Sequence, residues 1–178
     1  MSKILVVVGS GKNGNTDHLA QSFIKGAIAS GHDVQKVVLD NIQGCIGCQS
    51  CQRNSHHCVI HDSMEDIYPL FKEADTIVLA SPLYFWSVSG RLKSFIDRLY
   101  AISINDEYPS KNTILLMTSG SNGFYAFEQA ISFYRFYTKA LGWLDKGMVL
   151  AYGCKKELKH HFINEQYLKE AYDLGKSL

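Results

Sequence analysis

Short apolar runs alternate with amphipathic segments along the whole chain. Runs of five or six residues that are rich in Val, Ile, Leu or Met, with little polar alternation, are typical of strands buried on both faces of a parallel sheet. Five such runs are present, at residues Ile4–Val8, Val34–Leu39, Thr76–Ala80, Thr113–Met117 and Met148–Tyr152. The segments between them repeat apolar residues at helical spacing. This alternation predicts one α/β domain over residues 1–178, a doubly wound five-stranded parallel sheet with helices on both faces.

The helix predictions rest on apolar positions three and four residues apart. Met64, Ile67, Tyr68 and Phe71 follow the capping candidates Asp62 and Ser63, with Pro69 inside the pattern. The other expected helices begin near Thr16, begin behind Ser87 or Ser89, span Phe124–Leu141 and span Asn164–Lys176.

The predicted helix at 124–141 carries more aromatic residues than one buried face needs. We expect Phe127, Ile131, Tyr134 and Leu141 to face the sheet, which leaves Phe133, Phe136 and Tyr137 on another face. Excess apolar surface on a helix favours a subunit interface. A homodimer or homotetramer is therefore expected.

Composition narrows the class of protein. The 178 residues are 46% hydrophobic and 20% charged, with a formal net charge of +1. A nearly neutral chain has no field that attracts nucleic acid or an anionic membrane surface. The longest apolar runs are far shorter than the roughly 20 residues of a spanning helix, and Ile4–Val8 is followed at once by glycines, unlike a secretory signal. We expect a cytoplasmic protein with no membrane or nucleic-acid partner.

A glycine-rich turn follows the first apolar run. Gly9, Gly11 and Gly14 precede a predicted helix, and such a turn presents backbone N–H groups and a helix N-terminus to a phosphate. A dinucleotide with Asp40 on its ribose is one interpretation, and a tight turn that binds nothing is another. An NTP-binding loop is disfavoured, because Asn15-Thr16 stands where Lys-Ser/Thr is needed. A single terminal phosphate, as in FMN, suits the neutral donors Ser10, Asn13, Asn15 and Thr16.

A second loop, after the third apolar run, contains three consecutive aromatic residues. Tyr84, Phe85 and Trp86 follow Pro82 and Leu83. In a sheet of order 2-1-3-4-5, ligands bind outside the carboxyl ends of the first and third strands. Amphipathic rings at that place suit a flat ring system, although they could also simply cover the end of the sheet.

The two loops together resemble a known family. Gly9-Ser10, Gly14-Asn15-Thr16 and the segment from Ser81 to Arg98 are similar to the flavodoxin-like NAD(P)H-dependent FMN reductases, and within them to the iron–sulfur flavoprotein branch. The resemblance implies the flavodoxin-like sheet order 2-1-3-4-5. It also implies that FMN contacts three segments: Ser10, Gly11, Asn13, Gly14, Asn15 and Thr16 at the phosphate, Pro82, Leu83, Tyr84, Phe85 and Trp86 at the isoalloxazine, and Ser119, Gly120 and Gly123 after the fourth strand.

The implied activity is that of an FMN-dependent oxidoreductase. Electrons would pass from NAD(P)H as co-substrate, or from ferredoxin, through FMN to a quinone, a flavin or another small acceptor, so the partners are small molecules or small redox proteins. No catalytic side chain is required, because the flavin accepts hydride directly, and N–H groups of residues 83–86 are expected to stabilise negative charge on the ring. The alternatives are a non-enzymatic electron carrier of the flavodoxin type and a zinc-stabilised binding or assembly module.

Four of the five cysteines lie in a long irregular insertion at about residues 42–61, hereafter the cysteine segment. Cys45, Cys48, Cys51 and Cys58 have a compact spacing that suits a 4Fe–4S cluster, in which each iron takes one thiolate. The iron–sulfur flavoproteins carry this arrangement. Zinc with help from His56, His57 and His61, or free thiols, are the alternatives. Cys154 is expected to be a small buried residue, and His160-His161 a solvated helix face.

Overall fold

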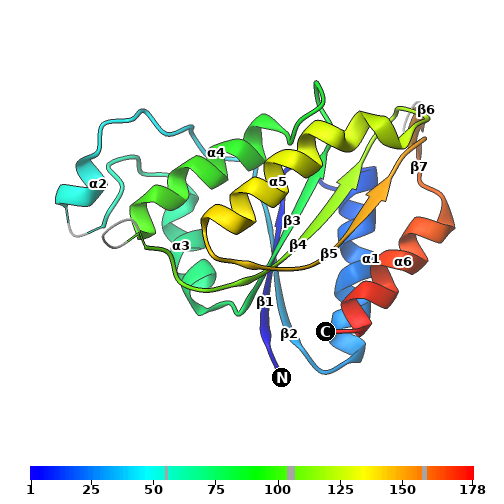
Figure 1. Ribbon diagram of the computed structural model, residues 1–178, viewed down its shortest axis with the longest axis horizontal. Coiled ribbons are helices and arrows are strands. Elements are labelled where there is room, and N and C mark those ends of the chain that lie inside the picture. The colour runs from blue at the N-terminus through cyan, green and yellow to red at the C-terminus, as the bar shows by residue number, and fades with distance from the viewer. Residues whose placement is uncertain (55, 104–106, 158–159) are drawn as a thin grey trace.

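The apolar runs form one parallel sheet. The computed structural model describes residues 1–54, 56–103, 107–157 and 160–178. All pairings in the main sheet are parallel, in the order β2-β1-β3-β4-β5 (Figure 1). This order confirms the predicted fold class. The strands are β1 (Lys3–Val8), β2 (Asp33–Val38), β3 (Thr76–Pro82), β4 (Asn112–Thr118) and β5 (Leu144–Ala151).

Two apolar cores lie on opposite faces of the sheet. Alternate residues of β1 divide between them, with Leu5 and Val7 in one core and Ile4 and Val6 in the other, which explains why the central strands are apolar throughout. One face is covered by α1 (Asn15–Ala29) and α6 (Glu165–Lys176). The other is covered by α3 (Met64–Glu73), α4 (Gly90–Arg98) and α5 (Glu128–Ala140) (Figure 1).

Several boundaries differ from the predicted ones. β5 begins at Leu144, earlier than predicted. It is an outer strand of the sheet, and its first residues are exposed, so they lack the apolar pattern on which the prediction rested. The predicted helix at 124–141 begins as the 3-10 turn η2 (Phe124–Phe127) before α5. A short helix, α2 (Ser50–Arg53), lies in the cysteine segment, and the 3-10 turn η1 (Leu99–Ile102) follows α4.

The prediction of a helix face at His160-His161 is wrong. These residues belong to β7 (His160–Phe162), which pairs antiparallel with β6 (Lys155–Glu157). Gly153, with φ of 68°, lets the chain turn after β5 and enter this pair. The resulting two-stranded sheet lies near the carboxyl end of β5 (Figure 1).

The aromatic face predicted for α5 is smaller than expected. Phe127, Ile131 and Tyr134 are buried, as predicted. However, Phe133 and Tyr137 stack on each other and pack half-buried against the core. Only Phe136 of the expected outer group is largely exposed, at 76%. The homo-oligomer stays a prediction.

The sheet sets the place of the candidate site. The carboxyl ends of the parallel strands lie together at one end of the sheet, and both chain termini lie toward the other end (Figure 1). Loops that follow β1, β3, β4 and β5 therefore converge, as expected for a ligand site in an open parallel sheet.

None of the helices that the structure describes combines the length and apolar character required to cross a bilayer.

The helices α1 and α6 pack closely against each other because each carries a glycine at the contact. A Cβ on Gly26 would lie 2.0 Å from the Tyr172 carbonyl oxygen, and one on Gly175 would lie 2.2 Å from that of Phe23. Gly26→Ala should lower the free energy of unfolding by about 1–3 kcal/mol, because the overpacking outweighs the better helix propensity of alanine. Urea denaturation measures this. Gly90→Ala is the matched control, since a Cβ on Gly90 would have no described atom within 4 Å; equal stability of the two variants would contradict the close approach.

Candidate functional site

A cavity of about 380 Å³ opens where the loops after the strands meet. Its volume lies in the usual range for small-molecule sites. We call it the edge cavity. It is lined by Ser10, Gly11, Lys12, Gly14, Asn15, Thr16, Pro82, Leu83, Tyr84, Thr118, Ser119, Gly120, Cys154 and Lys155.

The glycine turn is held in place by α4. The Ser89 hydroxyl donates to the Gly9 carbonyl at 2.7 Å, and it also accepts from the Leu92 N–H as the cap of α4. A Cβ on Gly9 would lie 2.7 Å from this hydroxyl and 2.8 Å from Leu92 Cβ. Glycine is therefore required at position 9 by a close approach of the helix.

The N-terminus of α1 opens into the edge cavity. Its N-cap residue is Gly14, which has no side chain to satisfy the first N–H groups of the helix. Asn15 donates through Nδ2 to the Lys155 carbonyl at 3.1 Å, while its Oδ1 is buried and has no partner among the described residues. The open N–H groups at this helix N-terminus fit an anion such as a phosphate, and the Asn15 Oδ1 could accept from a hydroxyl elsewhere on the same ligand.

Two buried hydroxyls, bonded to each other, add one donor to the edge cavity. Thr16 and Thr118 place their Oγ1 atoms 2.6 Å apart. Whichever hydroxyl accepts in this pair keeps its own proton, which it can donate to a ligand. The exposed ammonium groups of Lys12 and Lys155 supply positive charge at the rim.

Asp17, in the first turn of α1, holds the glycine turn through a hydrogen bond to its backbone. Its carboxylate accepts from the Asn13 N–H at 2.9 Å and forms an ion pair with Lys36 at 2.8 Å. Burial alone would raise the pKa of Asp17, but the bonds from Lys36 and Asn13 outweigh it and lower the pKa. The carboxylate is thus ionised, and its charge is neutralised by Lys36.

The aromatic loop forms a very tight hairpin. Tyr84 and Ser87 exchange backbone hydrogen bonds of 3.0 and 3.1 Å, and the two residues between them have positive φ, 46° at Phe85 and 60° at Trp86. This turn usually takes glycine or asparagine. Bulky residues there cost on the order of 1–2 kcal/mol each. Such strain is typical of functional loops.

The hairpin uses some of the backbone N–H groups of this loop, so fewer of them can donate to a ligand. The Leu83 N–H donates to the Thr118 carbonyl at 2.7 Å, and those of Tyr84 and Ser87 are used within the hairpin. Among the contacts of the described residues, the N–H groups of Phe85 and Trp86 remain available. The expectation of donors throughout residues 83–86 is therefore reduced to these two.

A second cavity of about 350 Å³ adjoins the first at Leu83. Three aromatic residues line it, namely Phe85, which is 93% exposed, Trp86 and Tyr125. We call this the aromatic cavity. Its remaining lining residues are Ser121 and Ala126.

The structure gathers most of the predicted contact residues. Asn13 and Gly123 line neither the edge cavity nor the aromatic cavity, and Phe85 and Trp86 line the aromatic one. Lys12, Thr118, Cys154 and Lys155 were missed by the sequence prediction. Thr118 and Cys154 could have been found, because Thr118 ends β4 and Cys154 lies in the loop after β5, where ligand sites of parallel sheets are expected. Cys154 is buried, as expected.

The cysteine segment does not form a metal site in the described residues. Cys45 and Cys48 are exposed, whereas Cys51 and Cys58 are half-buried. Within the described part of the chain, no three His, Cys, Asp or Glu side chains are arranged to hold a metal ion. Four thiols suit a cluster chemically, but their present arrangement does not fit one, and it does not fit zinc.

The thiols also differ in their environment. Hydrogen bonds from the Ser50 N–H and hydroxyl lower the pKa of Cys48. Burial raises the pKa of Cys51, and the nearby Cys58 and Cys45 raise it further. Cys48 is therefore the more easily ionised of the two.

The sheet order and the surrounding helices define a protein with a flavodoxin-like fold, and a cavity opens at the carboxyl end of its sheet. Comparison with known proteins identifies the family. The family model for NADPH-dependent FMN reductase matches residues 2–144. The chain belongs to this family and is an FMN-dependent oxidoreductase.

Individual relatives place it in the iron–sulfur flavoprotein branch. An iron-sulfur flavoprotein of Archaeoglobus fulgidus is 28% identical over 183 residues, covering 99% of this chain and 78% of that protein. Another, from Methanocaldococcus jannaschii, is 32% identical over 112 residues, covering 61% of this chain and 58% of that protein.

Solved structures share the fold. An NAD(P)H:quinone oxidoreductase from Methanothermobacter marburgensis has a TM-score of 0.73 at 13% identity, covering 99% of this chain and 96% of that one. The azoreductase AzrA has a TM-score of 0.71 at 15% identity, covering 99% and 100%. At these identities the likeness concerns the fold alone.

Removing the Asp17 carboxylate should give a pH-dependent loss of stability. Asp17→Asn is expected to lower the free energy of unfolding by about 1–3 kcal/mol near pH 7, because Lys36 loses its charged partner. Since the folded-state pKa of Asp17 lies below its ordinary 3.8, this stabilisation is present above the unfolded-state pKa and is lost as the pH falls through the folded one. The gap between wild type and variant should shrink below about pH 4.

Urea denaturation at a series of pH values measures that gap. Asp40→Asn is the control, since Asp40 is an exposed carboxylate on the same side of the glycine turn. A gap that stays constant from pH 7 to pH 3 would show that the Asp17 charge does not contribute.

Proposed function

We propose that this chain binds FMN in the edge cavity, accepts electrons from NAD(P)H and passes them to a small acceptor such as a quinone or a flavin. The observation that carries the proposal is the open N-terminus of α1, with its glycine N-cap, beside a cavity walled by Pro82, Leu83 and Tyr84. When bound there, FMN would supply a ring that accepts a hydride. The residues of the chain bind and orient it.

The phosphate side of the cavity is proposed to act through neutral donors. The first N–H groups of α1 would donate to the phosphate oxygens, and so would whichever hydroxyl of the Thr16–Thr118 pair accepts from the other. Lys12 and Lys155 at the rim would offset the remaining charge. Because Asp17 is paired with Lys36, its carboxylate does not oppose this binding.

The ring side is proposed to act through shape and two backbone donors. Pro82, Leu83 and Tyr84 would contact the isoalloxazine, and the N–H groups of Phe85 and Trp86 would donate toward its polar edge as charge develops there. The aromatic cavity beside it would hold the flat part of a second molecule, nicotinamide or acceptor, against Phe85 and Tyr125. The name of one structural neighbour, NAD(P)H:quinone oxidoreductase, agrees with this pairing of substrates.

Asn15→Asp separates phosphate recognition from ring recognition. A carboxylate at the start of α1 should weaken FMN binding about 10- to 100-fold through repulsion of the phosphate. Riboflavin has the same ring and no phosphate, so its affinity should stay unchanged. Quenching of flavin fluorescence on titration gives both dissociation constants.

Asn164→Asp makes the same chemical change at the cap of α6, outside the edge cavity, and should alter neither constant. An equal loss of affinity for FMN and riboflavin in Asn15→Asp would contradict the proposed phosphate site.

Steady-state NAD(P)H oxidation with a quinone acceptor then tests the activity. Absence of turnover by the FMN-loaded protein would favour the electron carrier instead.

We also propose that Cys45, Cys48, Cys51 and Cys58 hold a 4Fe–4S cluster. Support comes from the four thiols at compact spacing and from relatives that are named iron-sulfur flavoproteins. Because the thiols do not form a ligand set in the described residues, cluster binding requires the cysteine segment to change conformation. No step of the proposed reaction is assigned to the cluster.

The cluster proposal predicts about four iron atoms per chain after anaerobic purification. Cys51→Ser should lose this iron because one ligand is gone, whereas Cys154→Ala should keep it. Iron, sulfide and zinc analysis of the three proteins gives the answer. Stoichiometric zinc, or neither metal in the wild type, would contradict the cluster.

A further inference from the structure

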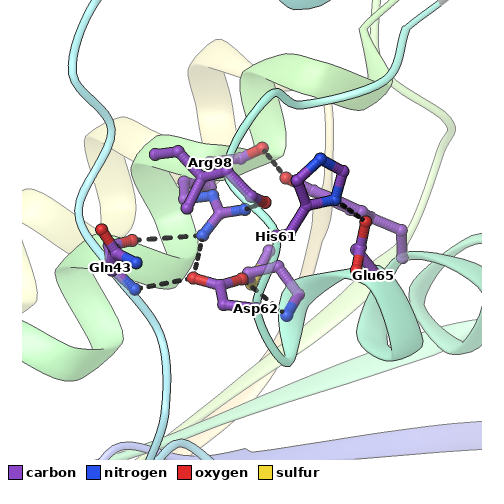
Figure 2. Close-up of polar contacts among 8 residues, drawn as sticks. Gln43, His61, Asp62, Glu65 and Arg98 are labelled. Atoms are coloured by element: carbon purple, nitrogen blue, oxygen red, sulfur yellow. Dashed lines mark hydrogen bonds and ion pairs between the residues drawn. The ribbon is translucent and has the colours of Figure 1, made fainter.

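Arg98, the last residue of α4, is buried beside the base of the cysteine segment. Its side chain is only 1% exposed. The guanidinium donates through Nη1 to the Gln43 carbonyl at 3.3 Å and through Nη2 to the Ile60 carbonyl at 3.0 Å. Figure 2 shows it pointing from α4 toward Gln43 and the carboxylate of Asp62, with which it forms an ion pair.

Asp62 completes the connection from the other side. One carboxylate oxygen accepts from the Gln43 N–H at 2.8 Å, and the other accepts from the Met64 N–H at 3.0 Å (Figure 2). Burial alone would raise the pKa of Asp62, but the bonds from Gln43 and Arg98 outweigh it and lower the pKa. Both partners are therefore charged. Residues near the beginning and the end of the cysteine segment are thus held at one buried point.

The opposite end of α4 contacts the glycine turn beside the edge cavity. Ser89, the cap of the helix, donates through its hydroxyl to the Gly9 carbonyl, and its N–H donates to the Ser81 hydroxyl at 2.8 Å. The nine residues of α4 span about 13 Å at 1.5 Å per residue. One short helix therefore connects the glycine turn to the base of the cysteine segment.

The body of the cysteine segment also contacts this helix and its continuation through uncharged groups. A Cβ on Gly44 would lie 3.6 Å from the Ser94 hydroxyl, and Gln52 donates to the Tyr100 carbonyl at 2.7 Å. Neither contact involves a charge. The buried ion pair is the attachment whose loss would leave an uncompensated charge as well as broken hydrogen bonds.

We propose that Arg98 is a positioning residue that holds the two ends of the cysteine segment, at Gln43 and Ile60, in a fixed place relative to the edge cavity, while the part between them that carries the four thiols can still rearrange. Its planar guanidinium reaches two carbonyls and one carboxylate at once, which a lysine ammonium on a flexible stem cannot match. The inference goes beyond the proposed function and does not require a cluster, because it concerns the attachment of the segment whether its thiols are free or bound to metal.

Cysteine alkylation, followed residue by residue by mass spectrometry on the full chain with FMN added, tests the inference. Arg98→Met should raise the alkylation rates of Cys51 and Cys58 at least about tenfold, because the segment opens locally. The rate at the buried Cys154 should not change. Arg98→Lys should give rates between those of Arg98→Met and the wild type.

Two further variants separate positioning from folding. The double variant Arg98→Met with Asp62→Asn removes both charges, so it avoids an unpaired buried carboxylate; it should fold and still show the faster alkylation. Lys93→Gln breaks an exposed ion pair on the same helix, Lys93–Asp97, and should leave all rates unchanged. Unchanged rates in the folded double variant, or rates that rise equally at Cys154, would overturn the inference. Iron analysis of the wild type tests the cluster proposal separately.

Discussion

The contact between Gly9 and Ser89 determines the geometry of the whole candidate site. A glycine at the end of β1 allows α4 to approach within hydrogen-bonding distance of the turn, and the Ser89 hydroxyl then bonds the Gly9 carbonyl while capping α4. The turn, the start of α1 and the loop after β3 are fixed together by this approach. A side chain at position 9 would push the helix away and displace all three.

The sequence predicts the sheet well because buried parallel strands are apolar on both faces, and this signal is local. It also predicts most of the residues around the edge cavity, since turns after parallel strands converge at one edge. Lys155 was missed because it enters through the β6–β7 pair, whose residues carry no apolar alternation. Phe133 and Tyr137 were assigned to an exposed face because their helical position does not reveal Trp143, against which Tyr137 packs edge-on. The attachment of both ends of the cysteine segment to α4 was also missed, because the contacts of Arg98 with Gln43 and Ile60 join residues far apart in the sequence, which spacing alone cannot reveal.

The hairpin at Phe85 and Trp86 has an unfavourable backbone conformation, and that conformation shapes the aromatic cavity. Positive φ at two bulky residues is unfavourable, and the exposure of Phe85 means that little burial offsets it. The same conformation leaves two N–H groups available among the described contacts and turns large rings toward the aromatic cavity. A glycine pair would relax the turn, but it would remove the surface against which a flat molecule can stack.

The two ends of α4 differ in whether charged groups are buried beside them. The neighbouring glycine turn offers mainly neutral donors, whereas the end beside the cysteine segment carries a buried ion pair. At the glycine turn, a ligand that exchanges with solvent is best bound by neutral donors and exposed lysines, because a buried unpaired charge would remain when the ligand leaves. At the cysteine segment, both charged partners are parts of the same chain. The buried ion pair between them therefore persists, and no exchange with solvent leaves either charge unpaired. Arg98 and Asp62 can therefore be buried in charged form, whereas Asn15 and Thr16 are uncharged. The same helix thus joins an exchangeable site to a permanent attachment.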